Sequence, residues 1–79
     1  MTNLEKYNKS FVQALELSEE LVNDSLVYAG VSEWDSIGHM NLIEHLETMF
    51  NIRLDTEDML AINSYTEGRV VLKKYGVEI

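Results

Sequence analysis

Residues 33–40 read EWDSIGHM, and the organisation of the chain follows from this stretch, where an irregular segment meets the most regularly patterned helix. Asp35 is a good N-cap, because its side chain can accept from the unpaired N–H groups of a first helical turn. Ser36 then takes the first helical position, with its hydroxyl turned outward at the positive end of the helix dipole. A phosphate ester on that hydroxyl would be stabilised there. The stretch indicates an attachment point for a phosphate-linked group, and the alternative is a plain capping pair.

A helical wheel of the segment that follows separates two faces. The core-facing stripe consists of Leu42, Ile43, Leu46, Met49 and Phe50. Ile37 and Met40 fall off that stripe, on the same side as Ser36. Glu44 and Glu47 lie on this side too. Exposed apolar side chains with an acidic rim are typical of a docking surface for basic partners.

The chain of 79 residues is acidic, with a formal net charge of −8. This charge argues against nucleic acid and anionic membranes as partners. Eleven of the acids lie between Glu16 and Asp58, where Arg53 is the one base. Beside Ser36 the acids favour the steering of a basic partner, whereas those further away form a solvated face.

The composition also limits fold and location. There are no cysteines, which excludes disulfides and Cys-based zinc sites. The two histidines, His39 and His45, fall about 120° apart around a helix, so they cannot share one metal and no metal site is expected. No run of 18 apolar residues and no N-terminal signal pattern occur. We expect one domain over residues 1–79, a soluble cytoplasmic monomer without membrane insertion.

Hydrophobic periodicity and capping signals predict an all-α fold, a four-helix bundle. Thr2 and Glu5 form a capping box before the first helix, and Ser64 and Glu67 form another before the last. The helices are expected at about residues 3–17, 36–50, 56–61 and 65–75.

The segment 18–35 is long for a connector, and its apolar residues predict that it lies against the bundle. We expect a helical turn near residues 19–22, a turn at Gly30 that other residues would find strained, and partial burial of Trp34.

The third helix is short, so it depends on packing for its stability. Asp55 or Thr56 can cap it, and Met59 and Leu60 are expected to face inward. Gly68 lies within the apolar face of the last helix, which predicts close approach of a neighbouring helix or room for a bound chain.

The Asp35-Ser36-Ile37 motif, together with the apolar stripe, the size and the acidity of the chain, resembles the acyl carrier proteins. In that family the serine of an Asp-Ser-Leu/Ile motif carries 4′-phosphopantetheine, derived from coenzyme A, whose thiol holds acyl groups as thioesters. The resemblance covers nearly the whole chain. It implies the family's fold, a bundle with a short third helix and a long loop between helices 1 and 2. It also implies a carrier of intermediates in fatty acid, polyketide or other specialised biosynthesis.

Two features depart from the family pattern. Glu33 stands where the family usually has glycine, two residues before the aspartate. Trp34, Gly38 and His39 differ from the fatty-acid-synthesis form, which carries an acid at the position of Gly38. These departures favour a discrete, specialised carrier that serves one dedicated pathway.

The resemblance also implies partners. A phosphopantetheinyl transferase (holo-ACP synthase), using coenzyme A and Mg²⁺, would modify Ser36. An acyl-loading ligase or acyltransferase and downstream synthase enzymes would follow. The residues expected to contact them are Asp35, Ile37, Met40, Glu44 and Glu47. The chemistry would then belong to the partners, so the chain itself is not expected to be an enzyme.

A sequestered acyl chain would be lined by Leu46, Leu54, Met59, Ile62 and Leu72. The alternative is that these side chains simply fill the core.

The sequence leaves three other functions to consider. An aminoacyl or peptidyl carrier would share the architecture. Ser36 and His39, three residues apart, could be a nucleophile and its base, but no oxyanion hole or orienting third group is indicated. An acidic interaction module would use Ile37 and Met40 as hot spots, with Ser36 only a cap and no prosthetic group.

Overall fold

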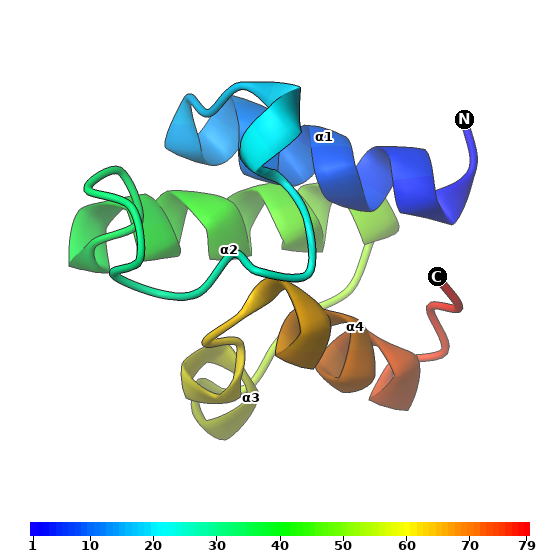
Figure 1. Ribbon diagram of the computed structural model, residues 1–79. Helices are drawn as coiled ribbons and strands as arrows, with labels where there is room; N and C mark the ends of the chain where they lie inside the picture. Colours follow the sequence, from blue (N-terminus) through cyan, green and yellow to red (C-terminus); the bar gives the residue numbers. More distant parts are fainter.

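Four α-helices and no β-strand make up the computed structural model, which describes residues 1–79 (Figure 1). The all-α fold is therefore confirmed. A single turn of 3₁₀ helix, η1 (Glu19–Leu21), lies within the long connection, where a helical turn was expected. The helices are α1 (Asn3–Leu15), α2 (Ser36–Phe50), α3 (Thr56–Ala61) and α4 (Tyr65–Lys74).

Each helix begins at a side chain that accepts from its first turn. Thr2 accepts from the Glu5 N–H at 3.1 Å, and the Glu5 carboxylate accepts from the Thr2 N–H in return. Asp55 caps α3 through the Asp58 N–H at 2.8 Å. The helix ends were predicted to within two residues. α1 ends at Leu15 rather than Leu17, because Glu16 adopts a left-handed conformation with φ 54°.

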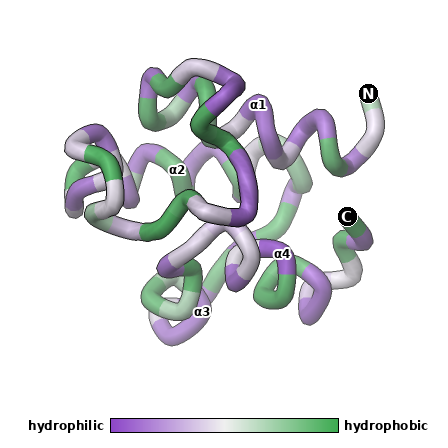
Figure 2. Tube along the Cα trace, in the orientation of Figure 1, coloured by the Kyte–Doolittle hydropathy of each residue, from purple (hydrophilic) through white to green (hydrophobic).

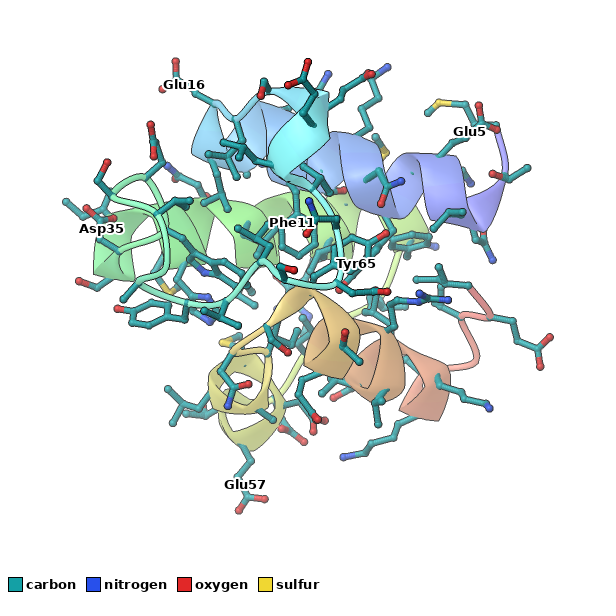
Figure 3. The ribbon with its side chains drawn as sticks, in the orientation of Figure 1. Glu5, Phe11, Glu16, Asp35, Glu57 and Tyr65 are labelled. Carbon is teal, nitrogen blue, oxygen red and sulfur yellow. The ribbon has the colours of Figure 1, made fainter.

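The core lies between the antiparallel pair α1 and α2 and the crossing helix α4 (Figure 1). Phe11 and Tyr65 point into it, whereas Glu57 points away from the molecule (Figure 3). In Figure 2, hydrophobic and hydrophilic segments alternate along α1, as an amphipathic helix requires. The largest side chains with almost no exposed surface are Tyr7, Phe11, Trp34, Leu42, Ile43, Leu46, Ile62 and Leu72.

Gly68 provides the close approach that its position in α4 predicted. A Cβ atom there would lie 2.2 Å from the Tyr7 hydroxyl oxygen. That hydroxyl donates to the Tyr65 carbonyl at 2.5 Å, and its burial raises the pKa of Tyr7 far above the ordinary value. The absence of a side chain at Gly68 thus makes room for the Tyr7 ring of α1.

The long connection lies against the bundle, as predicted. Its Leu26 is buried, and the Leu26 carbonyl accepts from the Tyr65 N–H at 2.9 Å. The turn expected at Gly30 is present, since its N–H donates to the Val27 carbonyl at 2.9 Å, but the left-handed residue of this turn is Ala29, with φ 63°. Gly30 is needed for space instead, since a Cβ there would lie 2.8 Å from a methyl group of Val27.

None of the four helices combines the length and the hydropathy that crossing a lipid bilayer requires.

Candidate functional site

Ser36 is the first residue of α2, and its side chain is exposed. The Asp35 carboxylate accepts from the Gly38 N–H at 2.8 Å, and the Asp35 carbonyl accepts from the His39 N–H at 2.8 Å. The N–H groups of Ser36 and Ile37 donate to no other group of the chain. Asp35 stands at the outer end of α2 (Figure 3). The serine hydroxyl is therefore displayed at a positive helix end with two free amide donors beside it.

Two large apolar side chains stand exposed next to the serine. Ile37 is 75% exposed and Met40 is 53% exposed, so neither is part of the core. Glu44, one turn further along α2, is exposed as well. The predicted exposure of these three side chains is confirmed.

Leu60 adds an exposed apolar residue that the periodicity of α3 did not predict. It is 72% exposed, so the expectation that it faces inward is wrong. A helix of six residues has only one narrow buried side, and Met59 and the buried Asp58 occupy it.

Glu47 differs from Glu44 because one of its carboxylate oxygens is already used. Its Oε2 accepts from the Leu54 N–H at 2.8 Å, and the side chain is half-buried. This bond holds the link between α2 and α3. No sequence pattern indicates it, since the two residues lie seven positions apart across a change of chain direction.

Trp34 is fully buried, where partial burial was expected, and it forms part of a polar connection. Its indole N–H donates to His39 Nδ1 at 3.0 Å, and His39 Nε2 lies 2.8 Å from the Met59 carbonyl oxygen. Because both ring nitrogens are engaged, His39 has no lone pair for the Ser36 hydroxyl. The serine–histidine pair that a hydrolase would need is not formed.

Position 38 requires glycine for a steric reason that the sequence did not reveal. A Cβ atom at this position would lie 2.2 Å from the Glu33 carbonyl oxygen and 3.0 Å from a methyl group of Leu15. The connection crosses α2 here with backbone against backbone. An acidic side chain, which the resemblance would place at this position, does not fit.

The five residues considered as an acyl-chain lining belong to the hydrophobic core. Leu46, Leu54, Ile62 and Leu72 are buried, and Met59 packs against them. The five main hollows of the surface, of about 140 to 610 Å³, are lined by none of them. The largest lies between α1 and the η1 segment, on residues that include Val12 and Val22. These five side chains fill the core in this structure.

Asp58 connects α3 to α4, a contact that the sequence did not suggest. Its carboxylate accepts from Lys74 Nζ at 2.7 Å and from the Tyr75 hydroxyl. These two donors hold the pKa of Asp58 below its ordinary value. The carboxylate in turn raises the pKa of Lys74 and of Tyr75.

No cluster of three metal-ligating side chains is present. Comparisons of the chain with models of protein families, with curated proteins and with solved structures gave no match.

Proposed function

We propose that this chain is a carrier protein, in which Ser36 receives 4′-phosphopantetheine and presents acyl or related intermediates to partner enzymes. The observation that carries the proposal is the exposed Ser36 hydroxyl at the N-terminus of α2, with Ile37 and Met40 exposed beside it. A serine that served only as part of a cap would need no apolar surface around it.

The residues at this end of α2 fit a phosphodiester. The free N–H groups of Ser36 and Ile37 and the helix dipole favour negative charge, an effect of about 0.3–1 kcal/mol at an exposed helix end. Asp35 does not compete for these two amides, because its carboxylate accepts from Gly38. When bound, the group would supply the thiol that holds cargo as a thioester.

The surface around Ser36 fits partner enzymes with a basic rim. Ile37 and Met40 supply apolar contact, and Asp35 and Glu44 supply exposed charge of the opposite sign. Glu47 acts in this account mainly by holding the α2–α3 link. The partners proposed are a phosphopantetheinyl transferase, an acyl-loading ligase or acyltransferase, and downstream synthase enzymes of fatty acid, polyketide or other specialised biosynthesis. An aminoacyl or peptidyl cargo would use the same residues.

The proposal is tested by incubating the folded protein with coenzyme A, Mg²⁺ and a broad-specificity phosphopantetheinyl transferase, then weighing the intact chain. We expect one phosphopantetheine adduct, lost in Ser36→Ala. Ser32→Ala is the matched control, because Ser32 is an exposed serine of the adjoining connection, and it should retain the adduct.

A second candidate is an acidic interaction module without a prosthetic group. The exposure of Ile37 and Met40 favours it, since hot-spot side chains of a docking surface need no attached group. Absence of an adduct on a chain with an intact helical spectrum would favour this candidate and contradict the carrier.

A further inference from the structure

His39 joins three segments of the chain. It lies in the first turns of α2, accepts from the indole of Trp34 in the long connection, and contacts the Met59 carbonyl of α3. The Trp34 and His39 rings are nearly parallel, with 18° between their planes and 6.2 Å between centroids, and the Tyr28 ring stands edge-on to the imidazole at 5.7 Å. No other side chain bonds both the segment before Ser36 and the helix after α2.

The partners of His39 fix the location of its proton. An indole N–H can only donate, so Nδ1 must offer a lone pair. A carbonyl oxygen can only accept, so Nε2 must carry the hydrogen. The neutral imidazole protonated at Nε2 is the one form that makes both bonds.

The bond to Met59 is valuable to α3 because the helix is so short. In a helix of six residues the last four carbonyl groups have no partner within the helix, and the Met59 carbonyl is one of them. His39, on α2, supplies the missing hydrogen-bond donor to this carbonyl group. α3 is also held through Asp58, which accepts from Lys74 at the end of α4 and from Tyr75 directly after it.

We propose that His39 is a positioning residue, which holds Trp34 and α3 in a fixed arrangement about the start of α2. Through Trp34 it steadies the backbone that leads into the Asp35 cap. Through Met59 it sets where the exposed Leu60 stands relative to Ile37 and Met40. Partner enzymes would then contact α2 and α3 at a fixed distance from each other. This consequence rests on the proposed carrier function.

Two substitutions separate the two bonds. In His39→Gln, the amide nitrogen reaches the position of Nε2, so the donor to Met59 is kept and the acceptor for Trp34 is lost. In His39→Asn, the amide oxygen takes the position of Nδ1, so the acceptor is kept and the donor is lost. His45→Gln is the matched control, because His45 lies on the same helix and contacts only the Asn41 carbonyl of its own helix, at 2.9 Å.

The first readout needs no partner. Hydrogen exchange of the amides of residues 59–63 should accelerate roughly three- to tenfold in His39→Asn, the effect of losing one hydrogen bond. It should stay near the wild-type rate in His39→Gln and His45→Gln. The emission of Trp34, the one tryptophan, should shift in His39→Gln and stay unchanged in His39→Asn. Equal exchange at residues 59–63 in His39→Asn and the wild type would overturn the proposal.

The second readout is the modification of Ser36 by the transferase. We expect KM to rise severalfold in His39→Asn with kcat unchanged, and to recover in His39→Gln, since the docking face is displaced while the hydroxyl is not. An unchanged KM in His39→Asn, despite faster exchange, would contradict a role in docking. If the wild type is not modified while the exchange pattern is as expected, the carrier function fails and the positioning of α3 by His39 stands.

Discussion

The α1–α2 pair and the short helix α3 are held in place by different forces. Phe11, Leu42 and Leu46 have no exposed surface, so α1 and α2 are joined by the burial of apolar side chains. α3 exposes Leu60 and is held by hydrogen bonds from His39 on one side and to Asp58 on the other. The difference teaches that Ser36 lies on a helix held by apolar burial, next to a helix held largely by polar contacts. Hydrophobic burial responds little to pH and salt, whereas polar contacts respond to both.

The largest effect should come from shortening a buried leucine of α2, and the same change to an exposed leucine of α3 should have almost none. Leu46→Ala should lower the free energy of unfolding by about 2–5 kcal/mol, because it leaves a cavity between helices. Leu60→Ala, the same change on α3, should alter it by no more than about 0.5 kcal/mol, since Leu60 is 72% exposed. Urea unfolding followed by circular dichroism measures both. Similar losses in the two variants would show that α3 is as deeply packed as α2.

Gly38→Ala should have the second largest effect. Its methyl group would lie 2.2 Å from the Glu33 carbonyl oxygen, and such overpacking costs about 1–3 kcal/mol. The free energy of unfolding should fall and the emission of Trp34 should change, because the connection must move away from α2. Asn41→Ala, an exposed change on the same helix, is the control and should leave both unchanged. A Gly38→Ala variant as stable as the wild type would contradict the close crossing at this point.

The smallest effect should be the pH dependence of the contact between α3 and α4. The pKa of Asp58 is lowered in the folded chain, so its contribution is present above the ordinary carboxyl range near 3.8 and is lost as the pH falls through the lower folded value. The pKa of Lys74 and Tyr75 is raised, so their contribution is present below about pH 10 and is lost at higher pH.

Hydrogen exchange in α3, corrected for the intrinsic effect of pH, checks this dependence. Opening of α3 relative to α2 should increase below about pH 4. Asp58→Asn should remove this increase at acid pH, because the amide does not titrate. If the increase at acid pH persisted in that variant, it would be assigned to another carboxylate.

Features set by neighbouring residues were predicted well. Thr2, Asp35 and Ser64 cap their helices because a cap needs only a side chain and the next turn. The exposure of Ile37 and Met40 follows from the period of one helix, so the wheel of α2 was sufficient.

Features that depend on distant segments were missed. The Met59 carbonyl meets His39 across 20 positions, and a backbone oxygen leaves no trace in the sequence. The fold turns a glutamate expected at the docking surface, Glu47, toward the Leu54 N–H. The left-handed residue of the turn is Ala29 rather than Gly30, and the Ala29 N–H donates to the Trp34 carbonyl, five positions later, at 3.0 Å.

A count of thiols per chain tests the central claim most directly, because the chain contains no cysteine of its own. After incubation with coenzyme A, Mg²⁺ and a phosphopantetheinyl transferase, followed by removal of free coenzyme A, we predict one thiol per chain in the wild type and none in Ser36→Ala. A folded wild-type chain that gains no thiol, or a Ser36→Ala chain that gains one, would contradict the account.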